Sequence, residues 1–377
     1  ERMEALKGEL MAGMEERGID TLTRERIFDQ LKAFADFGFP ESHSFSFAHI
    51  VYASAWLKVH APEHFYAAIL SSQPMGFYSP ATLVQDARRH GVTVLGPSVN
   101  DSFLDTGVQC APGVPGEQEY REGRPDPLPS RQVIPLDVDE ELVVRIGLSS
   151  VRGLGRAAER IVRVRETGAF SSQADLANRA HLSASDMECL AMAGALECLG
   201  VGRREGTWAA GALAAPTARQ GEWQPFLPGT EVGTRVPDLP PLTRTEQMCA
   251  DIETTGLTPG KHPFSYLRGD LPPGVLRAAE LGAHLDGRIV DVAGLVTHRQ
   301  RPHTGGGVTF LSLEDESGFV NVSVAVGTWN KFRRIGLESG ALLVRGTLEW
   351  GDGAVNVRAF RLAPVHLPIQ VRSRDFR

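Results

Sequence analysis

This sequence contains two glycine-containing turns and a run of arginines whose residue types and spacing suit the binding of an anion. The first turn, Val151-Arg152-Gly153-Leu154-Gly155, precedes a segment with helical spacing through Arg165. Two glycines permit a tight turn whose backbone N–H groups point outward at the start of a helix, where the helix dipole favours an anion. A DNA phosphate fits such a turn, together with Arg152, without any reading of the bases.

Three arginines follow the first turn at helical spacing. Arg156, Arg160 and Arg163 recur at i, i+4 and i+7, so a helix would present them as one basic stripe beside the turn. The alternative is a structural glycine turn beside a solvated arginine face. Glu159 departs from the hairpin pattern, because that position often holds a small apolar residue. The arginines alone therefore leave both interpretations open.

A second helix–turn–helix pattern favours the binding interpretation. Ala193-Gly194-Ala195 separates two further helical segments, and hairpin motifs of this kind commonly occur in pairs. Residues 141–204 hold nine arginines against seven acidic residues, a small local excess of positive charge in an acidic chain. The sequence therefore predicts a tandem helix-hairpin-helix domain over 148–208.

Short strand patterns separated by glycine turns fill residues 286–366. The expected strands are 288–296, 308–314, 319–326, 342–349 and 354–362. A helical segment, 329–337, lies between the third and fourth strands, which is the element order of an OB-fold barrel. Trp329 and Phe332 are expected to fill the barrel, whereas Phe310 could lie in the core or on the surface.

OB-fold barrels commonly bind single strands with basic residues and stacking aromatic rings. The residues expected to do so here are Arg299, Arg301, His303, Phe319, Arg345, Trp350 and Arg358. Residues 299–303 are expected on the loop that joins the first two strands, a usual binding edge of this fold. Gly305-Gly306-Gly307 beside them would let a ligand approach the backbone closely.

The remaining patterns divide the chain into segments of different character. Residues 1–104 are mainly helical, with Thr23 and Ser79 as candidate caps; 105–147 contain short strands and a Pro/Gly-rich insertion. Residues 209–285 are interpreted as a linker with a short helix, and 367–377 as a tail. The predicted fold class is multidomain α+β: an all-α segment, the tandem hairpins and a C-terminal β-barrel.

No catalytic or metal-binding constellation stands out. Asp137-Val138-Asp139 resembles paired metal-binding carboxylates, but a solvated strand end is the better interpretation of this acidic stretch. His43 beside Ser42 and Glu41 does not form an acyl-transfer site. The four cysteines show no CxxC pair and the eleven histidines no metal-binding spacing, so we expect neither a metal nor a cofactor in this chain.

Bulk composition is that of an ordinary globular protein. Hydrophobic residues make up 42% and charged residues 23%, and the net charge of −7 by itself argues against a nucleic-acid partner. No apolar run approaches the length of a membrane span, and the polar first residues do not resemble a signal peptide. We therefore expect a cytoplasmic protein. The sequence begins inside a helical pattern, so we also expect it to be a fragment of a longer chain.

Several long motifs resemble one family. "GFPESHS" (38–44), "YASAWLK" (52–58) and "APEHF" (61–65) are similar to the fingers of the bacterial C-family DNA polymerases, the DNA polymerase III alpha family. "SSQPMGFYSPATLVQDARRHGV" (71–92) is similar to the error-prone, or ImuC, branch of that family. "RIGLSSVRGLG" (145–155), "LAMAGALECLG" (190–200) and "RQRPHTGGGVTFLSLEDESGFVNV" (299–322) resemble its hairpin and OB regions.

The resemblance implies a DNA-directed DNA polymerase that extends DNA by nucleotidyl transfer during damage-induced repair synthesis. The palm aspartates and their magnesium ions would lie outside this chain, so the fragment alone is expected to be inactive. Residues 1–104 would be the C-terminal part of the fingers. Ser42, His43 and Lys58 are then the best candidates for contacting the incoming nucleotide or the template, although helix capping and surface exposure explain them equally.

The resemblance also implies partners. DNA, both duplex and single-stranded, and deoxynucleotides are expected, with a sliding clamp reached through an inactive partner similar to Y-family polymerases. The possible clamp motifs, Gln224-Pro225-Phe226-Leu227 and Gln247-Met248-Cys249, are unconvincing. Two alternatives stay open: a free-standing nucleic-acid-binding module, and the equivalent segment of a replicative polymerase.

Overall fold

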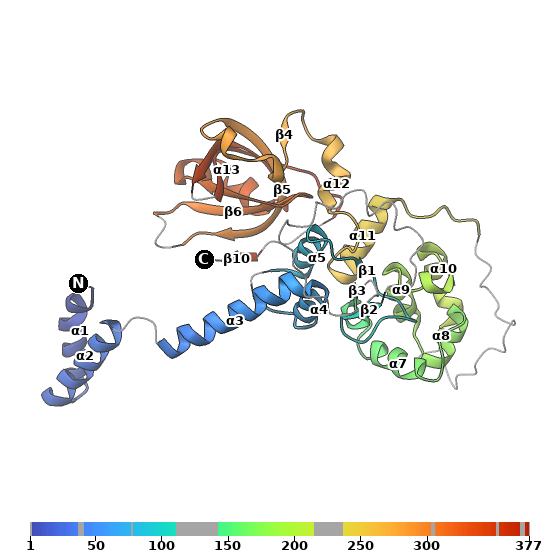
Figure 1. The fold of residues 1–377 in the computed structure, drawn as a ribbon, viewed down its shortest axis with the longest axis horizontal. Helices are drawn as coiled ribbons and strands as arrows, with labels where there is room; N and C mark the ends of the chain where they lie inside the picture. The colour runs from blue at the N-terminus through green and yellow to red at the C-terminus, as the bar shows by residue number, and fades with distance from the viewer. Residues whose placement is uncertain are drawn as a thin grey trace. The chain divides into compact units, whose positions relative to one another are not determined.

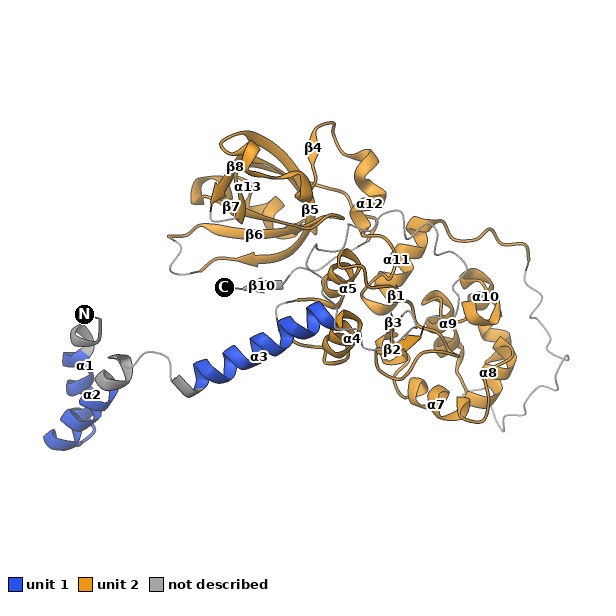
Figure 2. Ribbon diagram, in the orientation of Figure 1, with its two compact units in different colours: residues 1–60 blue, residues 61–377 orange. Residues whose placement is uncertain are grey.

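The computed structural model describes residues 2–36, 41–76, 78–110, 142–214, 237–302, 306–351, 354–369 and 374–376 (Figure 1). The chain divides into two compact units, Glu1–His60 and Ala61–Arg377 (Figure 2). Within the described residues no helix is long and apolar enough to cross a membrane.

The first unit consists of helices, as the sequence predicts. These are α1 (Arg2–Glu16), α2 (Thr21–Asp36) and α3 (Glu41–His60). The expectation that Thr23 caps the second helix is wrong, because α2 begins two residues earlier. Asp20 precedes it, and its carboxylate accepts hydrogen bonds from the Thr23 backbone N–H (3.0 Å) and hydroxyl (2.6 Å).

The second unit opens with two helices and a small sheet. Helices α4 (Pro62–Ser71) and α5 (Pro80–Arg89) precede β1 (Val94–Leu95), β2 (Gly107–Cys110) and β3 (Leu142–Arg145), which form a sheet in the order β1-β3-β2. The Ser79 hydroxyl accepts a hydrogen bond from the Thr82 backbone N–H, so the predicted cap is confirmed. The strand β2 was not anticipated, and the strand expected at 133–138 lies outside the described residues.

A compact helical domain follows. Its elements are η1 (Leu148–Ser150), α7 (Arg156–Arg165), α8 (Gln173–Ala180), α9 (Ala184–Met192), η2 (Glu197–Leu199) and α10 (Arg203–Leu213). One apolar core holds them together, and the side chains of Leu154, Ile161, Leu176 and Leu190 are fully or almost fully buried in it. The predicted tandem helix-hairpin-helix fold is therefore present, and its last helix extends to Leu213.

The segment interpreted as a linker is structured over much of its length. Residues 215–236 lie outside the description, but 237–285 carry defined elements. These are α11 (Arg244–Thr255), α12 (Pro263–Leu267), η3 (Arg268–Asp270), β4 (Val275–Leu276), η4 (Ala278–Glu280) and η5 (Ala283–Leu285). Thr243 and Glu246 form a capping box that starts α11. The predicted short helix is therefore present as α11, and the rest of 237–285 carries further short helices and a strand that were not expected.

The last domain is a closed barrel. Its strands are β5 (Ile289–Gln300), β6 (Thr309–Glu314), β7 (Phe319–Val324), β8 (Ala341–Gly351) and β9 (Ala354–Pro364), with α13 (Val326–Glu338) after the third (Figure 1). They pair in the order β5-β6-β7-β9-β8, and β8 pairs again with β5. Only β7 and β9 run parallel among these pairs. This is the predicted OB-fold order.

Side chains from every barrel strand fill the interior. Trp329 of α13 is buried in this core and Phe332 packs against it, so the predicted role of both is confirmed. A Cβ atom on Gly336 would come within 2.6 Å of the Trp329 ring, so glycine lets the indole pack against its own helix. A short strand, β10 (Arg374–Phe376), pairs with the end of β5.

Candidate nucleic-acid interface

The first hairpin turn is open to a ligand. Gly153 has φ +84° and Gly155 φ +47°, and both residues are exposed. Leu154 between them is buried in the hairpin core, which holds the turn in place. Gly155 caps the ten-residue helix α7, and the backbone N–H groups of Gly155 and Arg156 have no hydrogen-bond partner among the described residues. Donors at a helix N-terminus in this arrangement suit a phosphate.

The predicted arginine stripe is only partly free. Arg156 and Arg163 are exposed and form no ion pair with any described residue. Arg160 instead folds onto the end of α8, where its Nε donates to the Ala180 carbonyl at 3.1 Å, and it approaches Asp186 at 3.7 Å. The stripe therefore offers two cations without an ion-pair partner among the described residues, Arg156 at the first position of α7 and Arg163 in its last turn.

Arg152 points away from a ligand on the turn. Its Nη1 atom donates to the carbonyl oxygens of Ile252 (3.3 Å) and Glu253 (3.0 Å) at the end of α11. Its backbone N–H donates to the Thr254 carbonyl at 2.7 Å. The structure thus places this predicted DNA contact against a helix C-terminus, where the helix dipole favours a cation.

The second hairpin turn lies later in the chain than the sequence interpretation put it. Ala193-Gly194-Ala195 follows α9 but does not start a helix; α10 starts after Gly200-Val201-Gly202. Gly200 (φ +72°) and Gly202 are the counterparts of Gly153 and Gly155. The signal was present as an internal repeat, since "GLGR" (153–156) recurs as "GVGR" (200–203).

The two turns differ in charge. At the second turn, the Gly202 N–H donates to the Glu205 carboxylate at 3.3 Å, so an acidic side chain already occupies the N-terminus of α10. Arg203, the counterpart of Arg156, turns inward and pairs with Asp251 at 2.6 Å. Only the first turn therefore combines free N–H groups with free arginines among the described residues.

On the barrel, Arg299 is not where it was expected. It lies inside β5, only 7% exposed, rather than on the following loop. Its Nε donates to the Gly336 carbonyl at 2.7 Å and its Nη2 to the Ser339 carbonyl at 2.6 Å. The expectation that Arg299 reaches DNA from the loop is wrong, because the side chain is buried and satisfies the end of α13. Arg301 is exposed after β5, and His303 lies outside the described residues.

Aromatic and basic side chains share the outer face of β6, β7 and β9. Phe310 of β6 is 43% exposed, so it is not a core residue. It pairs with Ser323 of β7, which pairs with Arg358 of β9, so ring and cation lie in one row across three strands. Two strand spacings separate them, about 10 Å. This face is the usual strand-binding surface of OB folds.

The other predicted aromatic contacts differ in accessibility. Trp350 is 40% exposed and lies one residue before the end of β8. Phe319 is 38% exposed, but the guanidinium of Arg89 lies 5.2 Å from its ring centre. One face of Phe319 is thus occupied, which leaves Phe310 and Trp350 as the better stacking surfaces.

The remaining barrel arginines are paired but accessible. Arg345 contacts Asp291 at 3.2 Å and Arg358 contacts Glu349 at 3.1 Å, and both arginine side chains are more than half exposed. Exposed pairs of this kind contribute little to stability, so either arginine can exchange its partner for a phosphate at small cost.

The predicted fingers residues do not form one site. His43 and Lys58 lie near opposite ends of α3. At 1.5 Å per residue their backbones are about 22 Å apart. The His43 ring packs against Phe47. The side chain of Ser42 lies outside the described residues.

No group of three or more His, Cys, Asp or Glu side chains that could hold a metal ion occurs within the described residues. Residues 111–141, which include Asp137 and Asp139, lie outside them.

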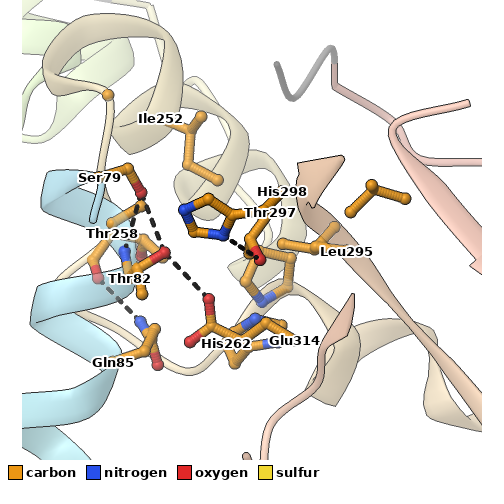
Figure 3. A pocket seen from close by; sticks show the side chains of 14 residues that line it. Ser79, Thr82, Gln85, Ile252, Thr258, His262, Leu295, Thr297, His298 and Glu314 are labelled. Atoms are coloured by element: carbon orange, nitrogen blue, oxygen red, sulfur yellow. Dashed lines mark hydrogen bonds between the residues drawn. The ribbon is translucent and has the colours of Figure 1, made fainter. Parts of the chain in front are cut away.

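A cavity of about 120 Å³ lies where α5, the α11–α12 segment and the barrel meet (Figure 3). Glu314 of β6 accepts a hydrogen bond from the Thr82 hydroxyl (3.1 Å) and pairs with Arg89 (3.0 Å). Burial raises the pKa of the Glu314 carboxyl to about 7, although Arg89 favours the charged form. Burial also lowers the pKa of His262 to about 3, and its Nε2 atom has no hydrogen-bond partner among the described residues.

Comparisons with known proteins agree with this architecture. A family model described as a helix-hairpin-helix motif matches residues 91–206. Along the whole of this chain, "Error-prone DNA polymerase" of Mycobacterium tuberculosis (strain ATCC 25618 / H37Rv) is 44% identical over 381 residues, which are 32% of that protein. The protein of the same name from Nocardia farcinica is 44% identical over 389 residues, with 31% of its length covered.

Two solved structures each match about a quarter of the chain. Asparaginyl-tRNA synthetase from Pyrococcus horikoshii is 22% identical, covering 25% of this chain and 24% of that chain with a TM-score of 0.23. An OBody bound to hen egg-white lysozyme is 21% identical, covering 25% of this chain and 94% of its own, with a TM-score of 0.22.

The chain is a multidomain protein that combines tandem helix-hairpin-helix motifs with an OB-fold barrel. The resemblance to the error-prone branch of the C-family DNA polymerases is confirmed, because curated proteins of that name match the chain from end to end. The chain spans about a third of the length of these relatives.

Proposed function

We propose that this chain is the DNA-binding part of an error-prone DNA polymerase, which extends DNA by nucleotidyl transfer across damaged template. The names of the relatives support the polymerase class. The observation that carries the DNA-binding role is the open turn at Gly153 and Gly155. Among the described residues, the N–H groups of Gly155 and Arg156 and the guanidinium of Arg156 have no partner at the start of α7, and Arg163 lies in the last turn of the same helix. This turn would hold the backbone of duplex DNA without reading sequence.

The barrel would hold the single-stranded template. Phe310 and Trp350 offer exposed rings, and Arg301, Arg345 and Arg358 offer cations around them. Stacking on aromatic rings together with a basic surface is how OB folds bind single strands with little sequence preference. The catalytic aspartates and their Mg²⁺ would lie in the part of the enzyme that this chain does not contain.

Deoxynucleotides and a sliding clamp belong to the same proposal. The clamp would be reached through an inactive partner similar to Y-family polymerases. Neither possible clamp motif supports direct binding: Met248 of the Gln247-Met248-Cys249 stretch is buried within α11, and 224–227 lies outside the described residues. Relatives named error-prone DNA polymerase match this chain along its whole length and are about three times as long, which argues against a free-standing module.

Fluorescence anisotropy with labelled duplex and oligo-dT tests the proposal. We expect the chain to bind both, with affinities that do not depend on duplex sequence. An Arg156→Ala, Arg163→Ala double variant should lower the log–log salt slope for duplex by up to about two units, because each phosphate contact contributes about 0.9. Oligo-dT binding should stay unchanged.

Arg334→Ala is the matched control, since this exposed arginine on α13 pairs with Glu338 in its own helix and with no other described residue. It should leave the duplex slope unchanged. Equal slopes for the double variant and the unaltered chain would contradict the assignment of the hairpin turn as the duplex site.

A further inference from the structure

Residues 244–268 contact three separate parts of the second unit. This segment comprises α11, α12 and the residues up to Arg268, and we call it the brace. At the hairpin domain, Arg152 holds the end of α11 through the Ile252, Glu253 and Thr254 carbonyls. Gly256 caps this helix with φ +79°, and a Cβ atom there would lie 2.6 Å from Arg152 Nη2. The brace therefore contacts the residue that directly precedes Gly153.

A second set of contacts fastens the brace to the other hairpin. Arg203 of α10 donates to the Asp251 carboxylate at 2.6 Å, and Asp251 also accepts a hydrogen bond from the Thr258 hydroxyl at 3.1 Å. Asp251 is buried, and this pairing satisfies its charge. Both hairpins thus hold α11 by ionic or charge-assisted bonds, which are stronger than neutral ones.

The far end of the brace reaches α5 and the barrel. Gln85 of α5 donates to the Thr258 carbonyl at 3.2 Å (Figure 3), and Leu257 is buried in the core around α4 and α5. Phe264 is fully buried beside Ala293 and Leu295 of β5. Arg268 makes a two-pronged contact with Glu316, with both N–O distances 2.8 Å.

We propose that the brace fixes the hairpin turn relative to the barrel, so that duplex and single strand are bound by one rigid surface, and that Arg152 is the positioning residue of this coupling. The inference rests on the proposed function of the two modules. Two sites held in a fixed relation raise the effective concentration of the second DNA segment once the first is bound. A duplex with a single-stranded extension then binds more tightly than either part alone.

The test uses the whole chain and a series of DNAs: the duplex alone, oligo-dT alone, and the same duplex with dT extensions of increasing length. We expect the unaltered chain to bind the duplex with a dT extension at least about tenfold more tightly than it binds the duplex alone or oligo-dT alone. Its affinity should be highest at one extension length. Arg152→Ala should lose at least about threefold of this gain and flatten the dependence on length. Its affinities for duplex alone and for oligo-dT alone should stay unchanged, which also shows that the variant is folded.

Arg268→Ala breaks the other end of the brace and should lose the same gain without touching the hairpins. Arg152→Lys keeps a cation at the end of α11 and should restore part of the gain. Arg179→Ala is the matched control, because Arg179 also donates to backbone carbonyls, those of Ala169 and Gly168, but inside the hairpin domain. It should keep the full gain.

The outcomes separate the two proposals. If the unaltered chain binds neither duplex nor oligo-dT, the proposed function fails. If it binds both but the junction gives no gain, or if Arg152→Ala keeps the full gain, the coupling is overturned while the function stands. A lower salt slope of Arg152→Ala on duplex alone would instead make Arg152 a direct phosphate contact and would also overturn its positioning role.

Discussion

At the scale of single residues, Glu314 and His262 line the cavity between α5, the α11–α12 segment and the barrel. They have opposite effects on how the free energy of unfolding depends on pH. Between pH 4.5 and about 7 the folded state keeps a proton on Glu314 that the unfolded chain has lost, so the free energy of unfolding falls as pH rises. Between pH 6.5 and about 3 the unfolded chain protonates His262 and the folded state does not, so the free energy of unfolding falls as pH drops. The two slopes oppose each other between pH 4.5 and 6.5.

Replacing Glu314 with glutamine should remove the contribution of Glu314 to the pH dependence and leave that of His262. Glutamine keeps a neutral side chain that can accept the Thr82 hydrogen bond, so its stability lacks the Glu314 slope. The difference in unfolding free energy between E314Q and the unaltered chain should move in favour of E314Q by at most about 1.4 kcal/mol per pH unit from pH 4.5 to 7. Urea unfolding at several pH values measures it, and a difference that is constant with pH would contradict the raised pKa.

At the scale of structural elements, the hairpin turn depends on backbone geometry that only glycine adopts easily. Gly155 combines φ +47° with ψ −127°, and no atom lies within 4 Å of a Cβ built there. Gly155→Ala should therefore act through backbone strain, of about 1–3 kcal/mol, and not through a clash. We expect weaker duplex binding in anisotropy titrations and unchanged oligo-dT binding.

Gly168→Ala is the control for this substitution. Gly168 has φ +137°, also with open space around it, but it follows the other end of α7. It should cost stability without changing duplex affinity. If both variants lower duplex affinity equally, loss of stability explains the effect and the turn is not the contact.

The outer face of the barrel makes a separate prediction. Phe310→Ala should weaken oligo-dT binding by about 1–3 kcal/mol if one base stacks on the ring. Phe310→Leu retains apolar area but no aromatic face, so it should weaken binding nearly as much. Full binding by the leucine variant would mean that the residue only covers apolar surface.

Arg301→Ala should lower the salt slope for oligo-dT and leave the slope for duplex unchanged.

At the scale of the whole molecule, the chain should bind a primer–template but not extend it. Nucleotidyl transfer by two metal ions requires a group of carboxylates, and the described residues contain no such group. Primer-extension assays with Mg²⁺ or Mn²⁺ should give no incorporation. If incorporation occurs, an Asp137→Asn, Asp139→Asn variant tests whether that pair, outside the described residues, supports it.

Structural features that depend on neighbouring residues could be predicted from the sequence alone. Alternating apolar residues and glycine turns gave the five barrel strands and the helix after the third, because strand and turn preferences act over a few positions. The turn at Gly153 and Gly155 was predictable for the same reason. The second turn was placed too early, at Gly194, although the repeat of "GLGR" as "GVGR" marks its position in the sequence.

Which charged side chains are bonded within the protein could be seen only in the tertiary structure. Arg152, Arg203 and Arg299 look like surface cations in the sequence, yet each turns toward carbonyl or carboxylate oxygens far away in the chain. The sequence predicted a short helix in the brace but not its contacts, because their partners come from α5, the hairpins and the barrel. Such contacts depend on how distant segments pack, and a buried polar group must find its partner there. Local sequence patterns carry no record of that pairing.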